Sequence, residues 1–349
     1  MQDEWNDKIF RVSKETFAPL ALEIFKFQFH NNIVYKDYTK ALGIDPVSVN
    51  TVEQIPFLPI RFFKSHAVQT TSFEPQAVFE SSGTTNTTNS RHLIKELSLY
   101  DESFIHTFKS FYGPIENYCI IGLLPSYLER KNSSLVYMVE KLIQLSRHSQ
   151  SDFYLNENKK LVTVLNELEN QRQKTILIGV TFALLDFAEK FSAGSYRENL
   201  KHTIIMETGG MKGRRKELIR PQVHNILSHA FNIRLIHSEY GMTELLSQAY
   251  SQGEGIFHCP LWMKALVRDD EDPLTIRSSE FRVGSPEPET QNSELRTQTG
   301  AINIIDLANI YSCSFIATDD VGKVYSNGSF EVLGRIDNSD LRGCSLMVV

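Results

Sequence analysis

Short runs of apolar residues recur along the middle of the chain and alternate with amphipathic segments. The apolar runs have the length of strands buried in a parallel sheet, and they lie at 118–125, 175–180, 202–210 and 233–241. Residues 181–191 and a stretch near 221–230 have the apolar spacing of helices that cover such a sheet. This alternation predicts an α/β fold with a mostly parallel sheet flanked by helices.

The N-terminal part lacks this alternation. One helix is predicted to begin at Pro19 and to run to about residue 30, and another covers about 98–112. Between them, Pro56 and Pro59 exclude a regular helix and indicate an extended segment.

The last quarter of the chain has strand patterns with few helical breaks. They lie at 300–307, 312–318, 322–326 and 329–335. Asn327–Gly328, between the last two, is a strong signal for a two-residue hairpin turn. We therefore expect a β-rich C-terminal part.

Composition and charge narrow the class of protein. The 349 residues are 41% hydrophobic and 22% charged, as in globular proteins, and the net charge of −6 argues against a nucleic-acid binder. No run approaches the roughly 18 apolar residues of a membrane helix, and the N-terminus lacks a signal-peptide pattern. Four widely spaced cysteines form no disulfide or zinc pattern. We expect a cytoplasmic protein without a membrane span.

Three polar clusters follow predicted strands, where ligands of open α/β sheets bind. Residues 81–90 are small and nearly all hydrogen-bonding, so they suit a polyphosphate, although a solvated loop has the same composition. Residues 207–216 combine glycines with four basic residues and form either an anion-binding turn or a solvated face. In 237–245, Glu239 and Glu244 could hold Mg²⁺, or the segment begins a helix capped by Thr243 or Glu244.

Rival phosphate-binding and nucleophile motifs are missing from the sequence. It contains no G-x-x-x-x-G-K-[ST], no G-x-G-x-x-G and no G-x-S-x-G. The histidines also lack the spacing of a zinc site.

The order of four motifs resembles the adenylate-forming superfamily. SSGTT, YGMTE, TDDVG and GRID stand in the places of its phosphate loop, YGxTE motif, TGD motif and GRxxD hinge motif. ETGGMKGR and the ending GRIDNSDLRGCSLMVV are most similar to the acyl-protein synthetase family of bacterial bioluminescence operons. IPFLPIRFFKSH also resembles the related phenylacetate–CoA ligases. The similarity covers nearly the whole chain.

This resemblance implies the large N-terminal-type domain of adenylate-forming enzymes, without the C-terminal lid that follows it in most relatives. We expect a single acyl-adenylating domain over 1–349. Its approximate parts are a helical and extended part with the phosphate loop (1–115), an α/β core (116–255) and a β-rich part that ends at the hinge motif (256–349).

The resemblance also assigns roles to residues. Those expected to bind the nucleotide are Ser81, Ser82, Gly83, Thr84, Thr85, Arg91, Gly209, Gly210, Tyr240, Gly241, Thr243, Asp320 and Arg335. The two glycines 209 and 210 would border the adenine, Asp320 would bind the ribose hydroxyls, and Glu244 would hold Mg²⁺. Asn86 replaces the usual last glycine of the phosphate loop, and the lysine that usually follows is absent. Arg91 and His92 are the nearest candidates for its charge.

The implied reaction joins a carboxylic acid, with a fatty acid favoured, to the α-phosphorus of ATP, and a thiol then attacks the acyl-adenylate. Cys344 occupies the place of the acyl-accepting cysteine, and neighbouring Arg342 could lower its pKa; the alternative is a small buried side chain. In most relatives the lid carries a lysine that takes part in adenylation. Lys212 is the candidate to replace it, with a surface ion pair as the alternative.

Other acyl acceptors stay open. Coenzyme A, a carrier or acceptor protein or a reductase partner could receive the acyl group. The chain could also be a non-catalytic binder of nucleotide or acyl groups.

Overall fold

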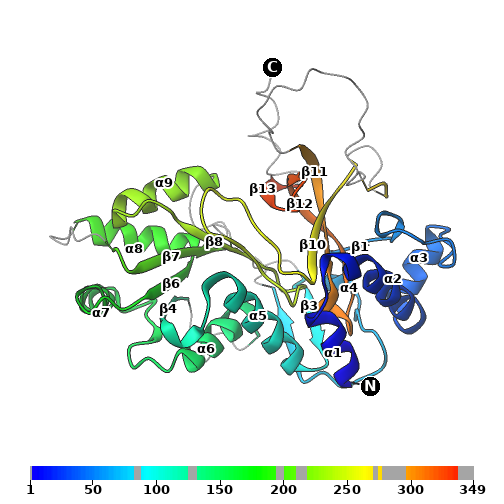
Figure 1. Cartoon of the computed structure of the whole chain (residues 1–349), viewed down its shortest axis with the longest axis horizontal. Helices are drawn as coiled ribbons and strands as arrows, with labels where there is room; N and C mark the ends of the chain where they lie inside the picture. The colour runs from blue at the N-terminus through cyan, green and yellow to red at the C-terminus, as the bar shows by residue number, and fades with distance from the viewer. Residues whose placement is uncertain are drawn as a thin grey trace, which may run out of the picture. The chain divides into compact units, whose positions relative to one another are not determined.

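A computed structural model describes residues 2–81, 88–124, 132–193, 200–209, 218–269, 274–276 and 296–336. The chain divides into two units (Figure 1). Unit 1 combines residues 1–74 with 258–349, and unit 2 is the continuous segment 75–257. Unit 2 contains the alternating strands and helices, and unit 1 contains the β-rich part. The predicted α/β fold class is therefore confirmed.

The six-stranded sheet of unit 2 has the order β5-β4-β6-β7-β8-β9. Its strands are β4 (Cys119–Leu123), β5 (Asp152–Phe153), β6 (Thr175–Val180), β7 (Thr203–Thr208), β8 (His237–Tyr240) and β9 (Ala249–Ser251). All neighbours run parallel except β8 and β9. Every residue of β4 and β6 is buried, which explains why these strands read as continuous apolar runs.

Helices cover both faces of this sheet. They are α5 (Leu97–Tyr112), α6 (Ser134–Ser146), α7 (Asn158–Asn170), α8 (Thr181–Ala193) and α9 (Arg220–Phe231). Helix α8 packs against β6 and β7 and contacts α7 and α9, while α6 packs against β4 and α5. In Figure 1, α8 and α9 lie on one side of the sheet and α5 and α6 on the other. Strands β4, β5, β6 and β7 are thus each followed along the chain by a covering helix.

A separate antiparallel hairpin precedes this sheet. Its strands are β2 (Ala77–Glu80) and β3 (Arg91–Ile94), paired from Ala77–Ile94 to Glu80–Arg91. The polar segment 81–90 connects the two strands of the hairpin.

The five-stranded sheet of unit 1 is mostly antiparallel. It consists of β1 (Leu58–Pro59), β10 (Met263–Arg268), β11 (Thr297–Asp306), β12 (Phe315–Tyr325) and β13 (Phe330–Arg335). The predicted strands 312–318 and 322–326 belong to one strand, β12, because its pairing with β11 resumes after a register shift at residues 318–320, where burial still alternates. The turn at Asn327–Gly328 is present, and Gly328 has a φ of 86°.

Helices of unit 1 pack around this sheet. They are α1 (Gln2–Phe10), α2 (Lys14–Asn31), α3 (Ile33–Ala41) and α4 (Phe62–Ser65). Gln28 of α2 is fully buried and donates through Nε2 to the carbonyl oxygens of Asn309 and Ile310, at 2.9 and 3.0 Å. The segment at Pro56 and Pro59 is extended, as predicted, and contributes β1.

The start at Pro19 that the sequence predicts for helix α2 is wrong. Helix α2 begins five residues before Pro19, because Ser13 and Thr16 form a reciprocal capping box. Pro19 therefore lies inside the helix, where its missing N–H removes one hydrogen bond near the N-terminal end.

None of the helices within the described ranges is long and apolar enough to cross a membrane.

Candidate functional site

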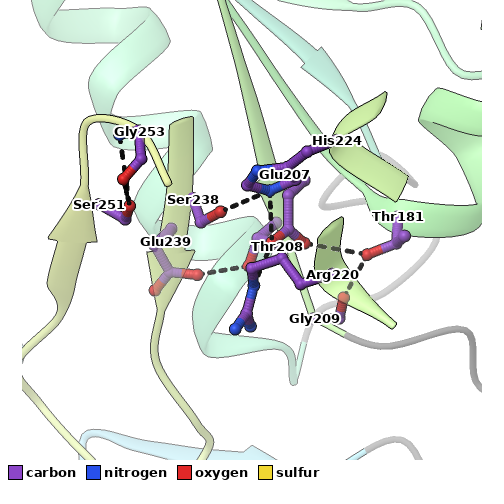
Figure 2. A network of polar contacts seen from close by, with 10 residues as sticks. All are labelled: Thr181, Glu207, Thr208, Gly209, Arg220, His224, Ser238, Glu239, Ser251 and Gly253. Atoms are coloured by element: carbon purple, nitrogen blue, oxygen red, sulfur yellow. Dashed lines mark hydrogen bonds and ion pairs between the residues drawn. The ribbon is translucent and has the colours of Figure 1, made fainter. Parts of the chain in front are cut away.

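Polar side chains gather where β6, β7 and β8 end. Thr181 directly follows β6, Glu207 and Thr208 end β7, and Ser238 and Glu239 lie in β8 (Figure 2). The carboxyl ends of parallel strands meet at one edge of a sheet, so three neighbouring strands bring these side chains together.

Glu207 is the centre of this network. Its side chain is buried, and Arg220 Nε of α9 lies 3.1 Å from its Oε1. His224 Nε2, one turn along α9, is 3.6 Å from the same oxygen and 3.1 Å from Ser238 Oγ. Arg220 also lies over the ring of Phe257, with 4.9 Å from its guanidinium carbon to the ring centroid. The carboxylate thus anchors the start of α9 to the end of β7.

Glu207 is held in its charged form. Burial raises the pKa of this carboxyl, but a hydrogen bond from His224, the charge of Arg220 and a hydrogen bond from Ser238 outweigh burial. Its pKa therefore lies below the ordinary value.

Thr181 extends the network to the turn after β7. Its hydroxyl lies 3.0 Å from Glu207 Oε2 and also contacts the carbonyl oxygen of Gly209 (Figure 2). Gly209 has a φ of 68°, a left-handed conformation that glycine adopts readily. The predicted adenine-bordering glycine is thus linked to the buried carboxylate through one hydroxyl.

Glu239 is a second buried carboxyl, and its pKa is shifted in the opposite direction to that of Glu207. Burial raises its pKa to about 7, the hydrogen bond from the Thr208 hydroxyl opposes this, and the negative charge of Glu207 adds to it. A Cβ atom at Gly241 would lie 2.3 Å from Glu239 Oε1, so a larger residue at the first position after β8 would displace this carboxyl.

The YGMTEL segment forms a turn between β8 and β9. No helix begins at residues 241–248, so the alternative of a helix capped by Thr243 or Glu244 is wrong. The Leu245 N–H donates to the Met242 carbonyl at 3.1 Å instead. Tyr240 ends β8, and its ring is 5.8 Å from that of Phe257, between centroids. Glu244 is buried.

His92 connects this turn to the hairpin. Its Nδ1 lies 2.8 Å from the carbonyl oxygen of Thr243. Burial lowers the pKa of His92 to about 4, against the opposing effect of this hydrogen bond. His92 is therefore neutral at physiological pH, and of the two cationic candidates only Arg91 carries a charge. Arg91 is exposed, with its Nε 3.8 Å from Glu80 Oε1.

The segment predicted to bind phosphate is closed at its base. The Ser81 N–H donates to the Ser90 carbonyl at 3.1 Å, and Ser81 Oγ accepts from the Ser90 N–H at 2.9 Å. The Ser81 hydroxyl thus fixes the hairpin end.

Unit 1 brings together the residues of two other motifs. Asp320 of β12 lies opposite Arg335 of β13, and Arg335 Nε is 3.3 Å from Asp320 Oδ1. Asp319, which stands where the TGD motif has glycine, pairs with Arg61 at 3.2 Å between Nε and Oδ2. The TDDVG and GRID motifs therefore meet in one ladder, and the IPFLPIRFFKSH segment is ion-paired to it.

Several predicted site residues lie outside the described part of the chain. They are Ser82, Gly83, Thr84, Thr85, Gly210, Lys212 and Cys344. Within the described part, no three His, Cys, Asp or Glu side chains are grouped so that they could hold a metal ion.

The sequence alone does not reveal the central network. It places Glu207 in a glycine-containing cluster, and no motif marks Thr181, Arg220, His224 or Ser238. The available signal was an acidic residue in the otherwise apolar run TIIMET, because a buried charge requires a partner.

The model of one protein family, described as "Acyl-protein synthetase, LuxE", matches residues 9–349. The chain belongs to this family. The resemblance found in the motifs is thereby confirmed, and family membership places the chain among ligases that activate an acid for acyl transfer.

One similar protein is the long-chain-fatty-acid–luciferin-component ligase of Vibrio harveyi. It is 21% identical over 356 residues, which cover 95% of this chain and 87% of the relative.

Solved structures show more distant similarity. The luciferase-like enzyme of the mealworm Zophobas morio is 14% identical with a TM-score of 0.47, covering 79% of this chain and 61% of that one. The O-succinylbenzoate coenzyme A synthetase of Bacillus subtilis, in complex with AMP, is 14% identical with a TM-score of 0.43, covering 78% and 67%. The match to a coronafacic acid ligase mutant of Pectobacterium brasiliense is 15% identical with a TM-score of 0.40; it covers 63% of this chain and spans only 39% of that one.

Proposed function

We propose that this chain uses ATP and Mg²⁺ to convert a carboxylic acid into an acyl-adenylate and then transfers the acyl group to a cysteine thiol, Cys344. The observation that carries the proposal is the hydrogen bond between His92 and Thr243. It joins the hairpin that bears the predicted phosphate segment to the turn that bears Thr243 and Glu244. The hairpin that bears one of the two predicted triphosphate-binding motifs thus contacts the turn that bears the other, within unit 2.

The proposed reaction has two steps. A carboxylate oxygen attacks the α-phosphorus of ATP, and pyrophosphate leaves. A thiolate then attacks the carbonyl carbon of the mixed anhydride, AMP leaves, and the thiol proton passes to solvent. A fatty acid is favoured as the substrate because the Vibrio harveyi relative is named as a long-chain fatty acid ligase. We propose that residues 1–349 act together as one acyl-adenylating domain.

The chemistry of the described cysteines supports Cys344 as the acceptor. Burial raises the thiol pKa of Cys119 to about 11, and that of Cys259 and of Cys313 to about 12. These three thiols therefore stay protonated at neutral pH and are poor nucleophiles. Cys119 and Cys313 are fully buried in the core. Of the four cysteines in the sequence, Cys344 is left as the candidate.

The acidic residues fit Mg²⁺ bound together with a nucleotide. Mg²⁺ in phosphate-transferring sites is held by one or two carboxylates plus substrate phosphates and water. The buried Glu244 could supply one carboxylate. The ion would neutralise phosphate charge as pyrophosphate leaves.

The intact mass of the protein tests this proposal. The protein is incubated with ATP, Mg²⁺ and a panel of fatty and aromatic acids. We expect a mass gain equal to one acyl group, removed by hydroxylamine and absent in Cys344→Ala. Cys259→Ala is the matched control, because Cys259 is only partly buried yet its thiol pKa is raised; this variant should acylate like wild type.

Other outcomes assign other functions. Acid-dependent release of pyrophosphate without an adduct would indicate that the acyl acceptor is coenzyme A, a carrier protein or a reductase partner instead of Cys344. Absence of both signals over the whole acid panel would favour a non-catalytic binder.

A further inference from the structure

The Thr181 hydroxyl is placed between two hydrogen-bond acceptors. One is a carboxylate oxygen, Glu207 Oε2, at 3.0 Å, and the other is the carbonyl oxygen of Gly209. Thr181 is 4% exposed, so water does not readily replace its hydroxyl. A hydroxyl has a single proton, and this proton is shared between the two oxygens.

Glu207 cannot turn away from this contact. Arg220 and His224 both approach its other oxygen, Oε1, at 3.1 and 3.6 Å. Oε2 therefore stays directed at Thr181. If the hydroxyl were removed, Glu207 Oε2 and the carbonyl oxygen of Gly209 would both lose the proton that they share. The less restrained of these two groups would then move.

The less restrained group is the Gly209 peptide. Gly209 has a φ of 68°, and a Cβ atom built on it would meet no atom within 4 Å, so no neighbour among the described residues packs against that side of its backbone. The hydroxyl of Thr181 donates to its carbonyl oxygen and so restrains the orientation of that group.

We propose that Thr181, held in place by Glu207, is a positioning residue that orients the Gly209 peptide against the adenine of bound ATP. This inference rests on the proposed function and on the resemblance, which implies that Gly209 borders the adenine. It predicts that the pair acts on the adenine end of the nucleotide and not on the phosphate end.

The test compares three substitutions in the full chain. Thr181→Val removes the hydroxyl with little change in shape, and Thr181→Ser keeps it. Thr203→Val is the matched control: Thr203 is equally buried at the other end of the neighbouring strand β7, and its hydroxyl donates to Glu169 Oε1 at 2.7 Å. Both valine variants lose a threonine–glutamate hydrogen bond, but only one loses the contact with Gly209.

Calorimetric titration with MgATP and with magnesium tripolyphosphate gives the readout. We expect Thr181→Val to bind ATP roughly five- to tenfold more weakly than wild type, with tripolyphosphate affinity unchanged within about twofold. Thr181→Ser and Thr203→Val should bind both ligands like wild type. In steady-state assays the KM for ATP should rise while kcat changes by less than about twofold.

Equal ATP affinity in Thr181→Val and Thr203→Val would overturn the inference, as would a parallel loss of tripolyphosphate binding. Binding is measured without any acid, so the inference is judged separately from the proposed function. A wild-type protein that binds ATP but releases no pyrophosphate with any acid would contradict the proposed function alone. A wild-type protein that does not bind ATP would contradict both.

Discussion

Glu207 and Glu239 end neighbouring strands, and both are buried, yet their surroundings give them opposite tendencies. Glu207 faces a guanidinium and an imidazole and keeps its charge. Glu239 has a hydroxyl donor from Thr208, while the nearby Glu207 disfavours a second negative charge. At the scale of single residues, the site thus contains one fixed charge and one carboxyl that titrates near neutral pH.

Glu239 makes the stability of the protein depend on pH. Its folded-state pKa of about 7 lies above its ordinary value of 4.5, so the folded state binds more protons between these values. The contribution of Glu239 to stability is therefore complete below about pH 4.5 and is lost as the pH rises through 7. We expect Glu239→Gln to remove this dependence.

Urea unfolding at pH 5 and pH 8 measures the effect. The free energy of unfolding of Glu239→Gln relative to wild type should rise between these pH values, by up to about 3 kcal/mol. Glu53→Gln, at a solvent-accessible position, is the control and should track wild type. A constant difference between Glu239→Gln and wild type from pH 5 to pH 8 would contradict the prediction.

At the scale of elements, the pairing of β12 with β13 sets the distance between two motifs. Asp320 faces Arg335 only because the ladder changes register between Val321 and Gly322. A Cβ atom at Gly322 would lie 2.0 Å from the carbonyl oxygen of Glu331 on β13 and 2.5 Å from Ile302 Cδ1. The close approach of two backbones at this glycine is therefore part of what aligns the TDDVG and GRID motifs.

Gly322→Ala should weaken this ladder. Because the obstructing atom belongs to a paired backbone, the strands must separate, and we expect a loss of at least about 2 kcal/mol in the free energy of unfolding. Gly334→Ala on β13 is the control, since a Cβ there would meet no atom within 4 Å; it should change stability by less than about 1 kcal/mol. Chemical denaturation compares the two, and equal stabilities would contradict the argument.

At the scale of the whole molecule, the two units differ in how the chain builds them. Unit 2 is continuous from residue 75 to 257, whereas unit 1 joins two segments that are far apart in the sequence. The sheets follow the same division, since β4 to β9 pair only with one another and β1 pairs with β12.

A fragment of residues 75–257 should therefore fold on its own. It contains a complete six-stranded sheet, its covering helices and the Glu207 network, so no strand partner would be missing. We expect cooperative urea unfolding and a dispersed amide spectrum. Residues 1–74 alone should not fold, because β12, the strand that pairs with β1, and the polar partners of Gln28 all lie outside this segment. Noncooperative unfolding of the 75–257 fragment would contradict this prediction.

The sequence predicts the parallel part of the fold well. Residues 175–180 and 221–230 correspond closely to β6 and α9, because a strand buried on both faces and a helix covering it leave strong apolar patterns. The patterns do not show local chemistry that competes with them: the capping box at Ser13 moves the start of α2, and pairing with β11 on both sides of a register shift joins two predicted strands into β12.

The candidate site could be predicted only in part. The motif order indicates Tyr240, Asp320 and Arg335, but no local pattern shows that Asp320 and Arg335 form a cross-strand pair. The burial of Glu207 and its partner Arg220 was also hidden, since their contact depends on how α9 packs beside β7. The neutral state of His92 follows from burial, which residue type alone does not reveal.

The buried contact of Gln28 with Asn309 has a consequence for synthesis on the ribosome. The two residues are 281 positions apart, and at roughly 5 to 20 residues per second the second emerges roughly 15 to 60 s after the first. During this interval unit 2 can fold, while helix α2 waits with its apolar face uncovered. The N-terminal segment of the nascent chain thus exposes apolar surface during this interval, and translation pauses near β12 would prolong its exposure to aggregation.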